Sequence, residues 1–336
     1  MKVKIVNKRI NLAVVGATGL VGRMVIKVLE EKNLPISNYL FFASKKSSGS
    51  KISLLNKEYT VRELNEHSFD SKIDYAIFCA GGEISKKYCP IAVSKGTVVI
   101  DNSSAFRMDK NVPLIVPEVN KEDIFLHNGI IANPNCSTIQ AMVALKPLND
   151  KYNIKRIVYS TYQAVSGAGQ EGINDLNNTL NGKENKKFPY KIANNCIPHI
   201  DSFLENGYTK EEMKMINETK KILHNNKLKI TATTVRVPVL NSHSESINVE
   251  FKKEIDINEI KELLNSSPGI ILEDDINNNI YPLAQNASGS DMVYIGRIRR
   301  DYSVKNGINM WVVADNIRKG AASNAVQILE IILNHL

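Results

Sequence analysis

Cys136 lies in a short stretch of residue types that could carry covalent chemistry. It follows Asn133-Pro134-Asn135 after an apolar run, and it precedes Ser137-Thr138 and an apolar helical pattern. A cysteine at such a strand-to-helix turn meets the free N–H groups and the dipole of a helix N-terminus, which lower the pKa of a thiol. Because the thiolate is the nucleophilic form, we predict that Cys136 is a catalytic nucleophile.

Three glycines predict that the same protein binds a dinucleotide. The segment VVGATGLVG places Gly16, Gly19 and Gly22 in G-x-x-G-x-x-G spacing, between the first strand pattern and the first helix pattern. Glycines allow a tight turn and the close approach of a pyrophosphate, whose negative charge is favoured at a helix N-terminus. The predicted cofactor contacts in this turn are Gly16, Thr18, Gly19, Leu20, Val21 and Gly22.

The end of the second strand pattern indicates which dinucleotide is bound. An NAD site usually has an acidic residue about 20 residues after the glycines, where it holds the ribose hydroxyls. The segment ASKKSSGS has no acid and offers hydroxyl and ammonium groups instead, from Ser44, Lys45, Lys46, Ser47 and Ser48. Such groups suit a 2′-phosphate, so we predict NADP, with contacts from Ser44, Lys46 and Ser47. An ordinary solvated loop is the alternative explanation of the lysines.

A nucleophilic cysteine beside a nicotinamide suggests aldehyde oxidation through a thiohemiacetal, hydride transfer and a thioester. The segment VRVPVLNSHSES contains Arg236 and His243, which we predict to lie on or near one strand. A histidine can move protons near neutral pH, and an arginine can bind a carboxylate through two parallel hydrogen bonds. Each residue alone is weak evidence, since His243 could equally have a structural role.

The first part of the chain, from Asn11 to about Pro134, alternates apolar strand patterns with helical ones. Short continuous apolar strands with helices between them predict a parallel sheet covered on both faces, which is a doubly wound, Rossmann-type α/β domain. One helix is predicted around Val21–Leu29 and another from about Glu83 to Ser94. The predicted strands are NLAVVG, YLFFAS, DYAIFCA, TVVIDNS, LIVPEV and IIANPN.

Longer strand patterns with alternating polar and apolar positions begin after about Ile139. They predict a mixed or antiparallel sheet in a second, α+β domain, with one face free to pack on a helix or a partner. The segment 174–195 is predicted only as an inserted helix and loop, and a last helix as about 318–333. The predicted domain limits are 1–137 for cofactor binding, 138–314 for catalysis and dimerisation, and 315–336 for a C-terminal helix that returns to the first domain.

The composition excludes several classes of protein. The net charge of +8 comes from scattered lysines without a recognition motif, which argues against nucleic-acid binding. No stretch approaches the roughly 20 apolar residues that span a bilayer, so no membrane partner is expected. The four cysteines have neither zinc-site nor disulfide spacing, so we expect no metal and a cytoplasmic location. We expect Cys79, Cys89 and Cys196 to be small buried residues.

Seven motifs in a fixed order make the chain resemble the aspartate-β-semialdehyde dehydrogenases, of the bacterial NADP-dependent kind. They are GATGLVG, SSAFRM, NPNCST, QAVSGAGQEG, EEMKMINETKKIL, RVPVLNSHSES and DNIRKGAASNAVQI. The resemblance implies NADPH-dependent reductive dephosphorylation of L-4-aspartyl phosphate to L-aspartate 4-semialdehyde, with release of inorganic phosphate. This step leads to lysine, diaminopimelate, threonine and methionine.

The resemblance also implies roles for individual residues. Cys136 is the nucleophile, Gln163 orients the acyl intermediate, and His243 is the acid/base. Residues implied to bind the substrate are Arg107, Asn135, Glu211, Lys214 and Arg236, with Arg107 and Lys214 on the phosphate, Glu211 on the amino group and Arg236 on the carboxylate. Further cofactor contacts are implied for Ser166, Gly167 and Asn316, although the glycine-rich segment could be a plain turn and Asn316 a helix cap.

Two alternatives stay open, and the family implies a homodimer. N-acetyl-γ-glutamyl-phosphate reductases share the fold and the cysteine chemistry, but their substrate has an uncharged nitrogen that gains nothing from Glu211. A non-catalytic NADP-binding regulator is the other alternative, although Cys136, Gln163 and His243 are all present. Because Glu211 and Lys214 are three residues apart, a helix would place them on one face.

Overall fold

The structure of the protein is a computed structural model that describes residues 10–335. The chain divides into two compact units. The first contains the chain up to Pro113, Glu122–Asn133 and the residues from Ala325 on, and the second contains Leu114–Lys121 and Pro134–Asn324. The domain limits 1–137, 138–314 and 315–336 stay a prediction, and each unit is described by itself.

A parallel sheet of six strands forms the centre of the first unit, with the order β5-β2-β1-β6-β7-β8. The chain extends the sheet on both sides of β1, which is the doubly wound arrangement expected from the sequence. A separate hairpin is formed by β3 (Lys51–Leu54) and β4 (Lys57–Thr60). The strands of the sheet are β1 (Asn11–Val15), β2 (Asn38–Ala43), β5 (Arg62–Glu63), β6 (Tyr75–Phe78), β7 (Val98–Asp101) and β8 (Ile130–Ala132).

The predicted strand LIVPEV is wrong. These residues add no strand to the sheet, and the short helix α3 (Pro117–Asn120) begins in the middle of the motif. Proline at the first helical position lacks an N–H that the helix would not use there, and its fixed φ suits a helix start. The proline therefore favours a helix here despite the β-branched residues before it.

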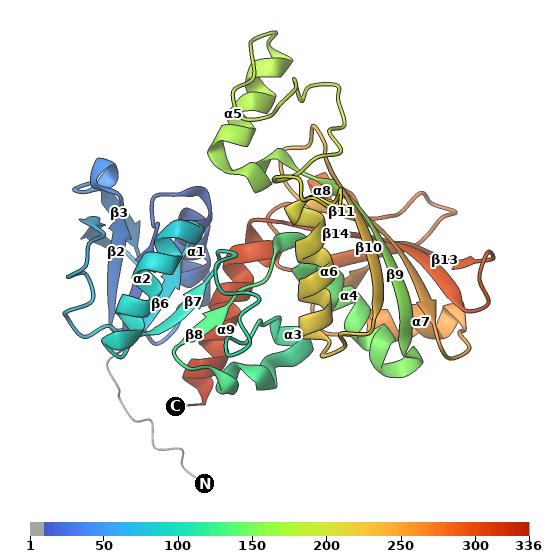
Figure 1. The fold of residues 1–336 in the computed structure, drawn as a ribbon, viewed down its shortest axis with the longest axis horizontal. Coiled ribbons are helices and arrows are strands. Elements are labelled where there is room, and N and C mark those ends of the chain that lie inside the picture. Colours follow the sequence, from blue (N-terminus) through green and yellow to red (C-terminus); the bar gives the residue numbers. More distant parts are fainter. Residues whose placement is uncertain (1–9, 336) are drawn as a thin grey trace. The chain divides into compact units, whose positions relative to one another are not determined.

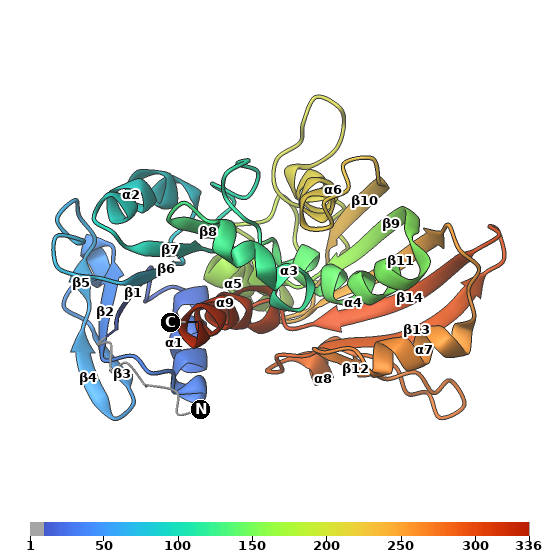
Figure 2. The same ribbon diagram turned by 90° about the horizontal axis from the view of Figure 1, so that it is seen from below.

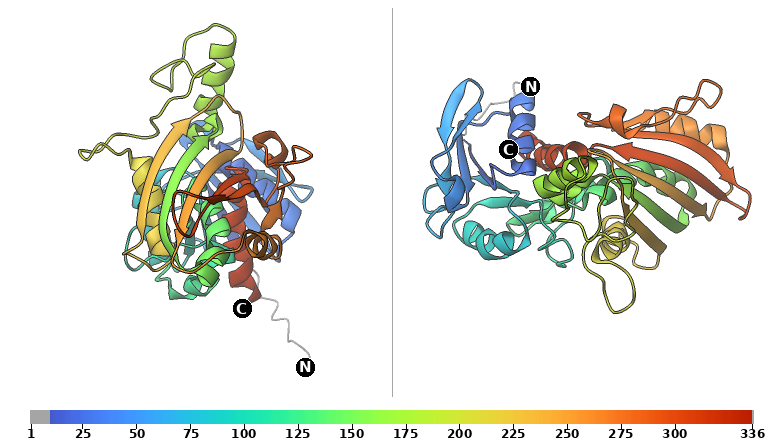
Figure 3. Two further views of the ribbon diagram at one scale, coloured as in Figure 1. Left: turned by 90° about the vertical axis from the view of Figure 1, so that its right-hand side faces the viewer. Right: turned by 90° about the horizontal axis from the view of Figure 1, so that it is seen from above.

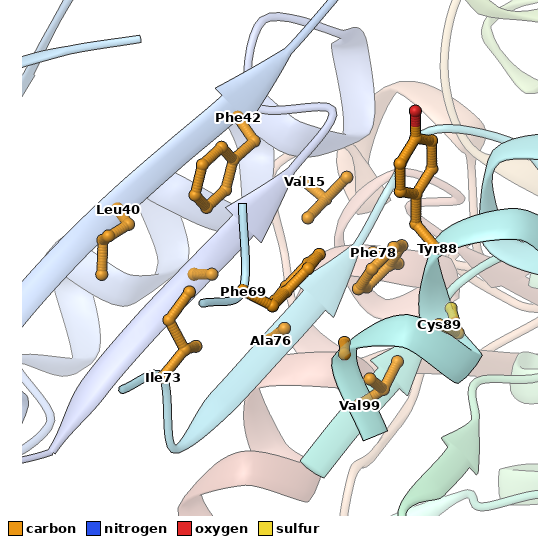
Figure 4. Packing of buried hydrophobic residues seen from close by; sticks show 12 residues of the cluster. Val15, Leu40, Phe42, Phe69, Ile73, Ala76, Phe78, Tyr88, Cys89 and Val99 are labelled. Carbon is orange, nitrogen blue, oxygen red and sulfur yellow. The ribbon is translucent and has the colours of Figure 1, made fainter. Parts of the chain in front are cut away.

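Helices cover both faces of the parallel sheet. Figure 2 shows α2 (Gly82–Ser94) on one face and, on the other, α1 (Leu20–Lys32) with the part of α9 (Ser323–Asn334) that belongs to this unit. An ion pair of 3.2 Å between Lys32 and Glu330 joins α1 and α9. In the core against α2, alternate strand residues pack on Tyr88 and Cys89 (Figure 4). Burial on both faces explains why the strands read as continuous apolar runs.

The second unit is built on a mixed six-stranded sheet with the order β10-β9-β11-β14-β13-β12. The pairs β9–β10 and β12–β13 are parallel, and the other neighbours are antiparallel. This confirms the predicted second fold, although the short strand β12 was not predicted. The strands are β9 (Ile154–Gln163), β10 (Lys229–Arg236), β11 (His243–Phe251), β12 (Ile270–Leu272), β13 (Val293–Asp301) and β14 (Gly307–Ala314).

One face of this sheet is covered by α4 (Cys136–Tyr152), α6 (Lys210–Ile222) and α7 (Ile257–Asn265) (Figure 1). Tyr159 of β9 is fully buried there, and its hydroxyl lies 3.0 Å from Thr219 of α6. On the opposite face, Tyr162 of β9 is exposed and its ring packs on Trp311 of β14 at 5.4 Å between centroids. The alternation along each strand therefore separates a buried layer from an open one.

The insertion between β9 and β10 begins earlier than predicted, because α5 spans Gly169–Leu180. A long stretch without regular helix or strand connects α5 to α6. Figures 1 and 3 show α5 standing away from the sheet of its unit, whereas Ile197 of the connecting stretch pairs with Arg236 at the end of β10. Cys196 lies in this stretch and is exposed, so its predicted burial is wrong, whereas Cys89 is buried and Cys79 is half-buried. The adjacent Ile197 is buried and forms a β-bridge with Arg236, so the alternation of side chains along extended backbone places Cys196 on the solvent side.

Shorter elements complete the description. They are the 3₁₀ helices Lys45–Ser47, Lys121–Leu126 and Val165–Ala168, the helix α8 (Ala284–Ala287), and a π-helical turn, Arg318–Ala322, which precedes α9. Among residues 10–335, no helix is both long enough and apolar enough to cross a membrane.

Candidate active site

Asn135 and Cys136 form the beginning of α4. Asn135 is the N-cap, and its side-chain oxygen accepts hydrogen bonds from the backbone N–H groups of Ser137 at 3.0 Å and Thr138 at 3.4 Å. The backbone N–H of Asn135 donates to the buried carboxylate of Glu218 at 2.6 Å. Cys136 is therefore the first residue of the helix, as predicted, and half-buried at a terminus that favours negative charge.

The three other central side chains lie at the ends of three neighbouring strands. Gln163 ends β9, Arg236 ends β10 directly beside it, and His243 begins β11 on the other side of β9. The prediction that Arg236 and His243 lie on or near one strand is wrong. Residues 237–242 carry the chain across the end of β9, so that Gln163 lies between them.

His243 is fully buried and held as a neutral ring. Its Nδ1 accepts the backbone N–H of Ala164 at 3.0 Å, and Nε2 has no hydrogen-bond partner among the described residues. Because Nδ1 is an acceptor, the proton of the neutral ring belongs on Nε2. Burial and the charge of Arg236 lower the pKa of His243 to about 3, against a smaller opposite effect of Glu211. The ring therefore offers one N–H donor at Nε2.

Glu211 forms a charged junction in the same site. One carboxylate oxygen accepts from Asn135 Nδ2 at 2.9 Å and from Gln163 Nε2 at 3.1 Å, and the other lies 3.0 Å from Lys214 Nζ. The contact to Lys214 confirms that the two residues share a helix face. Burial alone would raise the pKa of Glu211, but Lys214 and the hydrogen bonds lower it to about 2. Glu211 is thus an ionised carboxylate.

Lys214 is shared between two carboxylates. Besides Glu211, it contacts Asp201 at 2.8 Å, and these charges raise the pKa of Lys214 although burial opposes them. Asp201 lies in the irregular segment before α6, so no sequence pattern connects it with Lys214. The ammonium group is therefore charged and already partly neutralised by the protein.

Arg236 is 5% exposed, and its guanidinium donates to the carbonyl oxygen of Ala164 at 2.6 Å. A side chain at Gly167 would place its Cβ 2.9 Å from Arg236 Nη1 and 3.2 Å from His243 Nε2, so it would press on both groups. Arginine stays charged even when burial lowers its pKa, as it does for Arg236. A guanidinium can bind a carboxylate in a bidentate pair, and this role of Arg236 stays a prediction.

Ser166 and Asn316 contact each other in the second unit. Asn316 Nδ2 donates to Ser166 Oγ at 3.0 Å, and the Asn316 side-chain oxygen accepts from the backbone N–H of Ser242 at 2.9 Å. Asn316 is not the cap of the following helical turn, because Asp315 accepts the N–H groups of Ile317 and Arg318. The amide of Asn316 thus orders the residues that precede His243.

The glycine turn of the first unit has the shape of a phosphate cradle. Gly16 has φ of +81°, and a Cβ there would lie 2.7 Å from the carbonyl oxygen of Cys79. At Gly22 a Cβ would lie 2.2 Å from the carbonyl oxygen of Gly16, so a side chain would open the turn. Helix α1 begins at Leu20, directly after the exposed Gly19. The residues present therefore fit a bound pyrophosphate at a helix N-terminus.

The segment after β2 lies next to this turn. Thr18 Oγ1 is 3.3 Å from Ser47 Oγ, which joins the glycine turn to the 3₁₀ helix Lys45–Ser47. Ser44, Lys45 and Lys46 are exposed, and neither lysine forms an ion pair within residues 10–335. The segment that carries the residues predicted to bind a 2′-phosphate is thus joined to the cradle through Ser47.

Arg107 belongs to the first unit, whereas Lys214 belongs to the second. Arg107 is buried, and its guanidinium donates to the carbonyl oxygens of Asn133 and Asn102, both at 2.9 Å. The joint role of Arg107 and Lys214 in phosphate binding stays a prediction.

Several positioning residues had no clear signal in the sequence. Thr161 donates to the Gln163 side-chain oxygen at 3.0 Å, and the Gln163 amide nitrogen donates to Glu211 at 3.1 Å. Gly320 is packed so tightly that a Cβ would lie 2.9 Å from Cys136 Cβ. Only Glu218 could have been found, because it follows Glu211 by seven residues and thus lies on the same face of α6.

Glu245 is a fully buried acid of β11, two residues further along the strand than His243. Glu245 is the register partner of Thr161 on the neighbouring strand β9, and Thr161 is the register partner of Thr234 on β10. Neither carboxylate oxygen of Glu245 has a hydrogen-bond partner among the described residues, and burial raises its pKa well above the ordinary value. A carboxyl group in this position is stable only when protonated.

We expect Glu245→Gln to remove a pH dependence of stability. A raised folded-state pKa means that the stability is complete below the unfolded pKa and is lost as the pH rises towards the folded pKa, at about 1.4 kcal/mol per pH unit. Thermal unfolding should therefore show that the variant gains stability relative to the unmodified protein between pH 5 and pH 8. Parallel curves for the two proteins would mean that Glu245 is not held protonated.

The chain matches two family models over most of its length. Residues 11–127 match the NAD binding domain of semialdehyde dehydrogenases, and residues 145–319 match their dimerisation domain. The first match and the glycine cradle show that the chain binds a nicotinamide cofactor.

Curated relatives and solved structures agree with these matches. The aspartate-semialdehyde dehydrogenase of Aquifex aeolicus is 55% identical over 331 residues, which cover 96% of this chain and 97% of that protein. Aspartate semialdehyde dehydrogenase II of Vibrio cholerae, solved in complex with ASA, is 47% identical, with a TM-score of 0.92 and coverage of 97% and 99%. The enzyme of Candida albicans, solved with NADP, is 25% identical, with a TM-score of 0.78 and coverage of 97% and 99%. The chain therefore belongs to the aspartate-semialdehyde dehydrogenase family.

Proposed function

We propose that the protein catalyses the NADPH-dependent reductive dephosphorylation of L-4-aspartyl phosphate to L-aspartate 4-semialdehyde and inorganic phosphate. The observation that carries this proposal is the arrangement of Cys136 at a helix N-terminus with two opposite charges, the ionised Glu211 and the buried Arg236. Such a site suits a substrate with an electrophilic acyl group, an ammonium and a carboxylate. The product serves the biosynthesis of lysine, diaminopimelate, threonine and methionine.

In the first step, the thiolate of Cys136 attacks the acyl carbon and the C–O bond to phosphate breaks. This forms a thioester on Cys136 and releases inorganic phosphate, with Lys214 and Arg107 proposed as the phosphate-binding cations. Reduced nicotinamide, when bound, supplies the hydride that converts the thioester to the aldehyde level. Breakage of the C–S bond then returns the thiolate and releases the semialdehyde.

His243 and Gln163 act on the acyl group during both steps. Negative charge develops on the acyl oxygen when the thiolate adds to the acyl phosphate, and again when hydride adds to the thioester. An N–H donor that is already oriented stabilises this charge. The Nε2–H group of His243 is such a donor, because Ala164 holds the ring through Nδ1. Gln163 is held at both ends, by Thr161 and Glu211, and is proposed to orient the acyl chain.

The charge of Glu211 favours this substrate over the N-acetylated one of the related reductases. Its pKa of about 2 keeps Glu211 ionised at neutral pH, where an ammonium group gains from the contact and an acetamide does not. The presence of Cys136, Gln163 and His243 in one connected site likewise disfavours a non-catalytic regulator.

We further propose NADP as the physiological cofactor. We expect the double substitution Lys45→Ala/Lys46→Ala to weaken NADP binding about tenfold, because hydrogen bonds from charged groups to a phosphate are lost. NAD lacks the 2′-phosphate, so its dissociation constant should stay within about twofold. Titrations with the reduced forms, followed by the fluorescence of NADPH and of NADH, would measure both constants, with Lys57→Ala as a matched control on β4. Equal affinity of the unmodified protein for NAD and NADP would contradict the proposal.

A homodimer is proposed from the open face of the second unit. This face carries Tyr162 and Trp311, and the matched dimerisation domain covers residues 145–319. Apolar and aromatic side chains on an exposed sheet face are typical of association surfaces. Sedimentation as a monomer at micromolar concentration would contradict this proposal.

The reverse reaction tests the proposed function. Purified protein is given L-aspartate 4-semialdehyde and NADP, and the appearance of NADPH is followed with and without inorganic phosphate. Phosphate-dependent formation of NADPH is expected, because phosphate must cleave the thioester on Cys136. Turnover of the N-acetylglutamate aldehyde instead would move the chain to the reductases, and inactivity with both aldehydes would overturn the proposal.

A further inference from the structure

Phe188 lies in the irregular insertion of the second unit, and its ring faces the guanidinium of Arg236. Arg236 Cζ is 5.8 Å from the ring centroid, which is within the range of a cation–π interaction. The ring also packs on a small core formed by Val165, Leu176, Ile192 and Ile197. Thus Phe188 contacts the proposed carboxylate-binding residue from one side and a hydrophobic core from the other.

The insertion also holds the backbone of Arg236. Ile197 and Arg236 exchange two backbone hydrogen bonds, of 2.9 and 2.8 Å. Because Ile197 belongs to the same small core as Phe188, backbone and side chain of Arg236 are attached to one packed group. The carbonyl of Ala164 provides a third fixed contact, at 2.6 Å from Nη1.

Asp175 of α5 determines where Phe188 lies. Its carboxylate is 1% exposed and accepts three consecutive backbone N–H groups, from Lys186 at 2.8 Å, Lys187 at 2.6 Å and Phe188 at 2.9 Å. Burial would raise the pKa of Asp175, but these hydrogen bonds lower it, so the carboxylate is ionised. A chain segment without helix or strand is thereby held at a defined point.

Gly172 brings α5 close enough for this arrangement. A Cβ at Gly172 would lie 2.3 Å from the carbonyl oxygen of Val165 and 3.2 Å from Phe188 Cζ. The absence of a side chain at Gly172 therefore leaves room for the Phe188 ring beside α5, whereas a Cβ there would press on it.

We propose that Phe188, held by Asp175, is a positioning residue that orients Arg236 and thereby sets the preference for substrates with an α-carboxylate. The inference rests on the proposed function, because Arg236 is assigned there to the substrate carboxylate. Phe188 does not touch the reacting atoms. Its removal should weaken recognition of the carboxylate and leave the chemistry on Cys136 largely intact.

The test compares Phe188→Leu with the unmodified protein in the phosphate-dependent assay. We expect KM for L-aspartate 4-semialdehyde to rise about five- to thirtyfold, the range of a buried cation–π interaction, with kcat within about threefold. The aldehyde 3-aminopropanal lacks the α-carboxylate, so its kcat/KM should stay within about twofold. Phe188→Tyr keeps an aromatic face and should restore KM. Tyr190→Leu is the matched control, because Tyr190 lies in the same segment and is 69% exposed.

A second variant, Asp175→Asn, tests whether the position of Phe188, rather than the presence of its ring, affects KM. Asp175→Asn loses acceptors for the three N–H groups, so trypsin should cleave faster after Lys186 and Lys187, and KM should rise as in Phe188→Leu. An unchanged KM in both variants, or an equal loss with both aldehydes, would overturn the inference while the proposed function stands. Failure of the unmodified protein to form NADPH would concern the proposed function instead.

Discussion

Cys136→Ser is expected to lower kcat by about 10³-fold or more, since a serine hydroxyl at neutral pH is a far weaker nucleophile than a thiolate. The substitution changes one atom of the side chain and keeps the helix start, where Asn135 remains the N-cap. Steady-state formation of NADPH from the semialdehyde measures the loss. Mass spectrometry of the protein incubated with acyl phosphate should show a covalent adduct in the unmodified chain and none in the variant.

The matched control for this prediction is Cys196→Ser. This control makes the same change from thiol to hydroxyl, but at an exposed position in the insertion. The kcat of the Cys196→Ser protein should therefore equal that of the unmodified protein. Near-equal thermal unfolding of both variants would exclude misfolding as the cause. An active Cys136→Ser protein would contradict covalent catalysis at this residue, whatever the fold.

His243→Ala is expected to lower kcat by roughly 10²-fold to 10⁴-fold, the range for losing a positioned proton or hydrogen-bond donor. The effect should be on kcat more than on KM, because the Nε2–H group interacts most strongly with the charge that develops on the acyl oxygen. The rate is measured in the same assay, over a range of pH.

The structure also predicts how His243 acts. Because burial and Arg236 lower its pKa to about 3, the kcat profile should show no break near pH 6.5 from this residue. His243→Gln can donate a hydrogen bond but cannot accept a proton as a base, so it should retain more activity than His243→Ala. If His243→Gln is as inactive as His243→Ala and a break near pH 6.5 is present, His243 acts as a base instead.

Some features of this protein follow from the sequence because they depend on residues close together in the chain. The glycine turn, the start of α4 at Cys136 and the Glu211–Lys214 pair are each set within one turn or one helix face. The two sheet types also follow from the strand patterns. Strands buried on both faces are continuous apolar runs, whereas strands buried on one face alternate apolar and polar residues. The motif order adds the family, and with it the substrate.

Only the tertiary structure decided which distant residues meet. The order β10-β9-β11 places Gln163 between Arg236 and His243, and strand order is not contained in any local pattern. The same pairing aims the Ala164 N–H group at His243 Nδ1, which selects the tautomer, and leaves Glu245 buried without a partner. The position of Phe188 depends on hydrogen bonds from three backbone N–H groups to the Asp175 carboxylate. Every residue except proline has such an N–H group, so the residue types of the loop do not reveal the contact. Long-range pairing of this kind depends on packing of the whole unit, and the sequence pattern around each residue does not reveal it.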